Sequence, residues 1–158
     1  MTHAIFCIVA LMVVLGDQLT KYLIEATLRL GEVRPVIPGF MNLTLVLNPG
    51  AAFGLLAEMG ASFRGAFFIT VSVGAIAFIL GYRWRCPQMG RLPALGLSLI
   101  LGGAIGNLVD RLRIGLVIDF LDFYYRAYHW PAFNVADSAI SIGVGLMLLE
   151  ILVERRGE

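Results

Sequence analysis

Three carboxylates stand in an otherwise largely aromatic and aliphatic stretch of this sequence, VIDFLDFYYRAYHWPAFNVADSAI, which runs from Val117 to Ile140. They belong to Asp119, Asp122 and Asp137. A charged Asp at the centre of a membrane helix costs about 2.5 to 3.5 kcal/mol on insertion scales, so each carboxylate needs water, a partner or a function. Two neighbouring carboxyl groups can share one proton, so that one acts as a base and the other as an acid. Such a pair can activate water against an amide carbonyl, which is the chemistry of aspartic peptidases.

The local sequence gives Asp119 and Asp137 different surroundings. Asp119 lies in the apolar run Leu116 to Leu121, where loss of solvent is expected to raise the pKa of its carboxyl group. Asp137 follows Asn134 by three residues, the spacing of a capping box at the start of a helix, and capping explains Asp137 about as well as catalysis does. Two carboxylates about 4 Å apart repel by about 4 kcal/mol at an effective dielectric near 20, so a facing pair would share a proton near neutral pH.

Metal and serine chemistry have few residues to use. His3 and His129 are the only histidines, and neither an HExxH nor a GxSxG motif occurs. We therefore expect no metal and no cofactor. His129 is better explained, with its aromatic neighbours, as a residue of the membrane interface.

The composition indicates what must position these groups. The chain has 158 residues, 59% of them hydrophobic and 15% charged, with a mean hydropathy of +0.85, which is typical of a membrane protein. Four apolar segments, each about 20 residues long, cover roughly Ala4 to Ile24, Phe63 to Tyr82, Leu92 to Val109 (with a helix to about 112) and Ala132 to Val153. We predict an all-α membrane protein: one domain over residues 1–158 with four transmembrane helices. The first helix is expected to be retained, because no Lys or Arg precedes its apolar run and no small-x-small motif follows it.

Two segments outside the helices are expected on one side of the membrane. The first, about 29–58, contains Asn42 to Asn48, where apolar and polar residues largely alternate, so it predicts a small extracytoplasmic segment with a half-buried strand. Asn48 to Gly54 follows as a turn of small residues, which is either a close-approach site or a plain connection. The second, Arg111 to Pro131, is predicted to be an extracytoplasmic loop. In the preceding helix, Gly102 and Gly106 favour close helix packing.

Charge predicts the orientation and some pairings. The linker between the second and third helices holds Arg83, Arg85 and Arg91 and no acid, which favours a cytoplasmic linker and cytoplasmic termini. The total number of Lys and Arg residues on each side favours the opposite orientation, because seven of the 12 lie on the other side. We give the short linker more weight. A net charge of +1 gives no indication of a nucleic-acid partner.

Two further carboxylates have basic residues close by in the sequence. Asp17 and Lys21 have the spacing of a helical ion pair. Asp110 and Arg111 are adjacent, and a local ion pair between them is expected.

Five motifs resemble, in order and spacing, those of signal peptidase II, also called lipoprotein signal peptidase. They are DQLTK (17–21), NPGAAF (48–53), GNLVDR (106–111), VIDF (117–120) and FNVADSA (133–139). The resemblance covers nearly the whole chain, and five ordered motifs are far more specific than any single one.

The resemblance implies a multi-pass aspartic endopeptidase of the bacterial inner membrane, whose active site is at the outer face. Such an enzyme cuts the signal peptide from a prolipoprotein just before its diacylglyceryl-modified Cys, among membrane lipid, and we expect a monomer. It implies that Asp119 and Asp137 are the catalytic pair, whereas Asp122 falls outside the motifs. The residues expected to bind substrate or support the site are Asn48, Gly50, Asn107, Asp110, Arg111, Asn134, Ala136, Asp17 and Lys21.

Two other classes of function use the same residues. A small proton-coupled transporter would use the Asp residues as a relay, which requires carboxylates spread across the bilayer, whereas these gather toward one face. A non-catalytic membrane scaffold would retain its activity after Asp119→Asn and Asp137→Asn.

Overall fold

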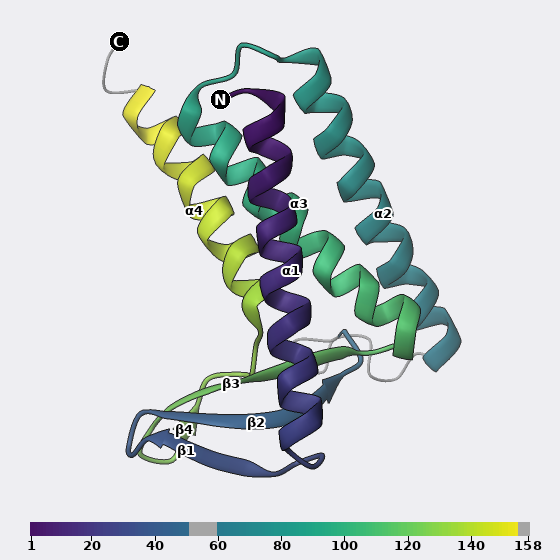
Figure 1. Ribbon diagram of the computed structural model, residues 1–158, viewed down its shortest axis with the longest axis vertical. Coiled ribbons are helices and arrows are strands. Elements are labelled where there is room, and N and C mark those ends of the chain that lie inside the picture. Colours follow the sequence, from purple (N-terminus) through teal and green to yellow (C-terminus); the bar gives the residue numbers. More distant parts are fainter. Residues whose placement is uncertain (51–59, 155–158) are drawn as a thin grey trace.

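The computed structural model describes residues 1–50 and 60–154, and it contains the four predicted helices (Figure 1). These are α1 (His3–Thr27), α2 (Ala61–Arg85), α3 (Arg91–Ile114) and α4 (Val135–Glu154). All four are long and apolar enough to cross a membrane. The part of the predicted small-residue turn after residue 50 lies outside the described residues.

Helix α3 forms the centre of the bundle, and glycines let its neighbours approach closely. A Cβ on Gly102 would lie 2.7 Å from the carbonyl oxygen of Ala10 in α1, and one on Gly96 would lie 2.8 Å from that of Gly143 in α4. A Cβ on Gly103 would collide with the carbonyl oxygen of Ala136. The close packing predicted at Gly102 therefore extends along much of α3.

The strands form one antiparallel arrangement in the order β1-β2-β3-β4. They are β1 (Val33–Ile37), β2 (Met41–Asn48), β3 (Val117–Tyr125) and β4 (Tyr128–His129). The alternating segment predicted as a strand is β2. The prediction of a plain loop between α3 and α4 was wrong, because β3 and β4 lie there. Periodicity did not reveal β3 because both of its faces are buried from Val117 to Phe120, so apolar residues do not alternate with polar ones.

The sheet lies at the end of the bundle opposite both termini (Figure 1). A core cluster of Ile24 and Leu28 from α1, with Leu45, Ile118 and Phe120 from the sheet, joins it to the helices. Strands β2 and β3 pair from Met41↔Phe123 to Asn48↔Val117, with an irregularity between Leu43 and Val46. This register brings the end of β2 beside Asp119.

Candidate active site

A cavity of about 500 Å³ opens where the sheet meets the helix bundle. Both predicted catalytic residues line it: Asp119 from β3 and Asp137 from α4. Four of the predicted supporting residues also line it, namely Asn48, Gly50, Asn107 and Arg111, together with Val46, Leu47, Pro49, Val117 and residues 130–133. Residues that lie almost 90 positions apart in the sequence therefore share one cavity.

Asp119 is almost completely buried, with 1% of its surface exposed. Its Oδ2 accepts a hydrogen bond from Nδ2 of Asn48 at 2.8 Å, and its Oδ1 accepts one from Nδ2 of Asn134 at 2.7 Å. Burial, together with the nearby charge of Asp137, raises the pKa of the Asp119 carboxyl group to about 7, even though the hydrogen bonds from the two amides act in the opposite direction. The group therefore titrates near neutral pH.

Asp137 is held in the first turn of α4 by the predicted capping box. Its backbone N–H donates to Oδ1 of Asn134 at 2.9 Å, and the backbone N–H of Asn134 donates to Oδ2 of Asp137 at 3.3 Å. Nδ2 of Asn107 donates to Oδ1 of Asp137 at 2.8 Å. No hydrogen bond joins the carboxyl groups of Asp119 and Asp137 directly within the described chain; Asn134 contacts both.

The orientation of the amide of each neighbouring asparagine is fixed by an unambiguous partner. Oδ1 of Asn107 accepts from Nζ of Lys21 at 2.9 Å, and Nδ2 of Asn134 donates to the carbonyl oxygen of Ile118 at 3.1 Å. Oδ1 of Asn48 accepts a backbone N–H two residues later at 2.8 Å. Since a lysine can only donate and a carbonyl can only accept, the three amides must present N–H groups to the two carboxylates.

Gly50 and Arg111 complete the polar side of the cavity. Gly50 has φ +96°, and a Cβ there would lie 2.5 Å from the ring of Phe68, so another residue would strain the backbone and clash. The guanidinium of Arg111 lies over the Phe68 ring, 5.3 Å from its centroid, and donates to the carbonyl oxygen of Asn107 at 3.4 Å. A cation thus lines the same cavity as the two carboxylates.

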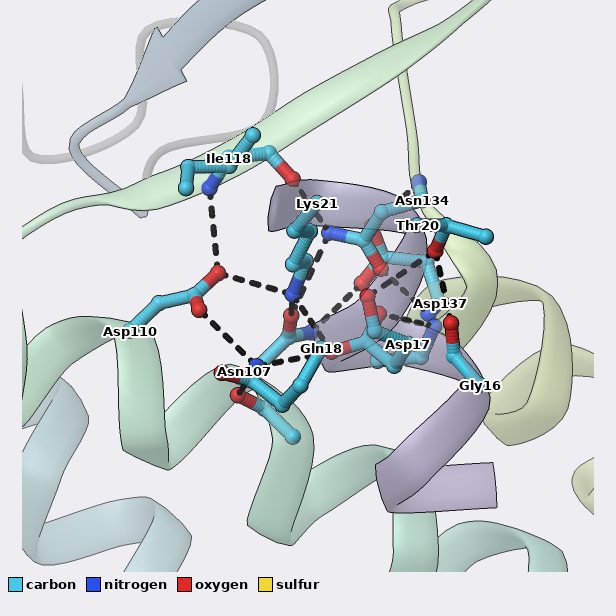
Figure 2. Close-up of polar contacts among 12 residues, drawn as sticks. Gly16, Asp17, Gln18, Thr20, Lys21, Asn107, Asp110, Ile118, Asn134 and Asp137 are labelled. Carbon is cyan, nitrogen blue, oxygen red and sulfur yellow. Dashed lines mark hydrogen bonds and ion pairs between the residues drawn. The ribbon is translucent and has the colours of Figure 1, made fainter. Parts of the chain in front are cut away.

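A buried ionic network lies behind the cavity (Figure 2). Nζ of Lys21 is 2.8 Å from Oδ2 of Asp17 and 2.7 Å from Oδ2 of Asp110, and all three side chains are at most 1% exposed. The predicted Asp17–Lys21 pair is therefore present, but it is part of a larger cluster. The predicted local pair of Asp110 with Arg111 was wrong, because Asp110 turns inward to Lys21, where a buried carboxylate gains a buried cation.

The network links the elements that carry the site. The backbone N–H of Ala136 donates to Oδ1 of Asp17 at 2.9 Å, and that of Ile118 donates to Oδ2 of Asp110 at 3.2 Å. One cluster therefore bridges α1, α3, β3 and the start of α4. This gives a structural role to Asp17, Lys21, Asp110 and Ala136, none of which lines the cavity.

Two features of this region escaped sequence reasoning. Gln18 donates to Asp110 at 3.0 Å and to Asp17 at 3.2 Å. Its place between Asp17 and Lys21 in the first motif was the available signal. Asp122 accepts from Nδ2 of Asn42 at 2.8 Å and pairs with Nδ1 of His129 at 2.8 Å, outside the cavity. Finding that pair required the β2–β3 register, which places Asn42 opposite Asp122.

Known proteins match this chain in both sequence and structure. A family model described as "Signal peptidase (SPase) II" matches residues 9–153. The lipoprotein signal peptidase of Desulforapulum autotrophicum is 48% identical over 149 residues, which cover 94% of this chain and 92% of that protein. The one from Syntrophotalea carbinolica is 50% identical over 147 residues, covering 92% and 89%.

Two solved structures described as bacterial membrane enzymes have the same fold. One superposes with a TM-score of 0.88 at 33% identity, covering 99% of this chain and 92% of the other. The second has a TM-score of 0.84 at 35% identity, covering 95% and 94%. Because sequence and fold both agree over nearly the full length, this chain belongs to the signal peptidase II family.

Proposed function

We propose that this protein is an aspartic endopeptidase of the bacterial inner membrane that removes the signal peptide from diacylglyceryl-modified prolipoproteins, cutting just before the lipidated Cys. The observation that carries the proposal is that Asp119 and Asp137 line one cavity at the end of a membrane-spanning bundle. Family membership supports a peptidase that acts on prolipoproteins.

Acid–base chemistry follows from the different surroundings of the two carboxyl groups. Asp119, with a pKa of about 7, supplies the proton, and Asp137 accepts one from water. The water oxygen attacks the scissile carbonyl carbon while Asp119 protonates the carbonyl oxygen. Asp137 then passes its new proton to the leaving amide nitrogen, and Asp119 recovers its own as the intermediate collapses.

The position of the cavity suits a substrate that is itself a membrane helix. A signal peptide spanning the bilayer presents its scissile bond where the chain leaves the hydrocarbon region. With the arginine-containing linker and both termini in the cytoplasm, the cavity opens at the outer face, and acyl chains remain in lipid between the helices. The Asp residues at this one end fit a hydrolytic site better than a relay across the membrane.

The test of substrate and bond is a cleavage assay with purified protein and two forms of one prolipoprotein, with and without the diacylglyceryl group on Cys. The expected result is a mass-identified cut immediately before the lipidated Cys, with the unmodified form cleaved at least about tenfold more slowly, equivalent to about 1.4 kcal/mol. Equal cleavage of both forms, or a cut at another bond, would refute this assignment.

A further inference from the structure

The far end of the sheet carries a cluster of exposed aromatic side chains. The two-residue turn between β3 and β4 lies at the left-hand end of the sheet (Figure 1), and the β1–β2 turn contributes Phe40. We call this surface the aromatic tip; it comprises Phe40 and residues 124–130. Exposed fractions are 52% for Phe40, 67% for Tyr125, 82% for Tyr128 and 66% for Trp130. A protein surface in water rarely leaves this many large rings together in the open.

Backbone hydrogen bonds and ring contacts order the aromatic tip. The backbone N–H of Tyr124 donates to the carbonyl oxygen of Phe40 at 2.9 Å, and that of Trp130 donates to Phe123 at 2.8 Å. The ring of Tyr124 stacks on that of His129 at 5.1 Å, and Phe40 packs edge-on against Phe123, also at 5.1 Å. These contacts order the backbone of the two turns and pack the inner rings, while the rings of Tyr125, Tyr128 and Trp130 remain exposed.

A cation occupies the apex of the turn in an unusual backbone conformation. Arg126 has φ +56°, a region that glycine or asparagine normally fills, and its guanidinium lies 5.4 Å from the centroid of the Tyr125 ring. No Asp or Glu occurs between Phe123 and Phe133. The exposed part of the tip therefore combines aromatic rings with the positive charge of Arg126, while the nearest acid, Asp122, is buried and bonded to His129.

We propose that the aromatic tip is a membrane anchor that docks into the phospholipid headgroup layer at the end of the bundle where the sheet lies. Tyr and Trp concentrate at this layer because their rings are apolar while their polar edges reach water, and Arg can contact lipid phosphates. The tip lies at the sheet end of four helices that are long and apolar enough to span a membrane, which is where a headgroup layer would meet the protein.

Anchoring has a consequence for the cavity. Trp130 lines both the hollow between the tip's rings and the cavity that contains Asp119 and Asp137. A tip seated among headgroups holds that cavity wall at the same depth in the bilayer. The docked tip thus sets the height at which a membrane-spanning substrate meets the two carboxylates.

The two tryptophans provide a test that does not depend on proteolysis. Trp84→Phe leaves Trp130 as the only tryptophan, and Trp130→Phe leaves Trp84 as the reference. Each full-length variant is placed in vesicles of zwitterionic and anionic phospholipid containing lipids brominated either near the headgroup end or near the terminal methyl of the acyl chain. Trp130 should lose about half of its emission to the shallow bromines, clearly less to the deep ones, and little to aqueous iodide.

Three outcomes would overturn the proposal. Strong quenching of Trp130 by iodide without quenching by either brominated lipid would place the tip in water, free for a protein partner. Stronger quenching by the deep bromines would place it in the hydrocarbon core, and no quenching by any agent would place it inside the protein.

Arg126→Gly in the Trp84→Phe background isolates the charge, because glycine adopts the left-handed turn conformation without strain. The variant should lose the part of the shallow quenching that anionic lipid adds over zwitterionic lipid. An unchanged lipid dependence would contradict the contact between Arg126 and phosphate.

Discussion

At the scale of single residues, the site is defined by which atoms of the asparagines face the carboxylates. Asn48, Asn107 and Asn134 each direct an N–H group at Asp119 or Asp137, because the side-chain oxygen of each already accepts a different hydrogen bond. These hydrogen bonds hold the two carboxyl groups in position. Such pre-positioned groups avoid the cost of reorganising at the moment of reaction.

Asp119 should make the native protein less stable as the pH rises. Its pKa is about 7 in the fold and close to 3.8 when unfolded, so the folded state binds the proton more tightly. Stability contributed by that proton is fully present below about pH 4 and is lost as the pH rises toward 7, by up to about 4 kcal/mol at about 1.4 kcal/mol per pH unit. Asp119→Asn should remove this pH dependence. Denaturation curves measured in detergent should therefore show the unfolding free energy of the variant rising relative to that of wild type between pH 4 and 8.

The comparison variant for this experiment is Asp122→Asn. Asp122 lies on the same strand but is bonded to Asn42 and His129 outside the cavity. The pKa assigned to Asp119 would be contradicted if Asp122→Asn gained as much unfolding free energy over this pH range, or if Asp119→Asn gained none.

At the scale of elements, the buried network determines how α1, α3, β3 and α4 fit together. Lys21→Met leaves the carboxylates of Asp17 and Asp110 buried without their cation, so we expect a loss of about 3 to 5 kcal/mol in unfolding free energy. Arg113→Gln removes an ion pair with Glu25 of similar length, 2.7 Å, whose side chains are partly exposed, and it should cost less than about 1 kcal/mol. Equal losses of unfolding free energy in the two variants would show that the buried cluster stabilises the fold no more than the Arg113–Glu25 pair does.

The contact between α3 and α4 rests on the absence of a side chain at Gly103. In Gly103→Ala the new methyl group meets the backbone oxygen of Ala136, which cannot rotate away, so we expect destabilisation of about 1 to 3 kcal/mol in detergent unfolding. Gly74→Ala in α2 meets no atom within 4 Å and should be neutral or stabilising by up to about 1 kcal/mol. Equal changes in stability for the two substitutions would contradict the close α3–α4 contact at Gly103.

Sequence patterns predicted the elements better than their contacts. The hydrophobic segments indicated all four helices, alternation indicated β2, and the Asn134–Asp137 spacing indicated the cap of α4, because each is a local property of the chain. Strand β3 was missed because its buried end has no alternation. The inward turn of Asp110 toward Lys21 was missed because it depends on how α1 packs against α3, which no local pattern encodes.

For the candidate site too, contacts between elements could not be predicted from local sequence patterns. The resemblance to signal peptidase II pointed to the residues that the structure brings together, whereas composition alone could not separate Asp119 from Asp122. The β2–β3 register makes the distinction, because it joins Asp122 to Asn42 and leaves Asp119 in the cavity.

At the scale of the whole molecule, the candidate site lies where two layers meet, a bundle of four membrane-length helices and a small sheet. Helix α3 supplies Asn107 and Arg111, α4 supplies Asp137, and the sheet at the end of the bundle supplies Asp119 and Asn48. Neither layer alone contains both carboxylates. The proposed activity is therefore a property of the junction, where water and a membrane-embedded peptide can both reach the pair.

The most direct test of this account is the cleavage rate of a diacylated prolipoprotein by four purified proteins in the presence of a metal chelator: wild type, Asp119→Asn, Asp137→Asn and Asp122→Asn. We predict that wild type and Asp122→Asn cleave with chelator present, while each of the other two loses at least about a thousandfold in kcat. Thermal unfolding of each variant in detergent shows that it is folded. Substantial cleavage by a folded Asp119→Asn or Asp137→Asn protein, or loss of wild-type cleavage to the chelator, would contradict catalysis by this pair of carboxyl groups.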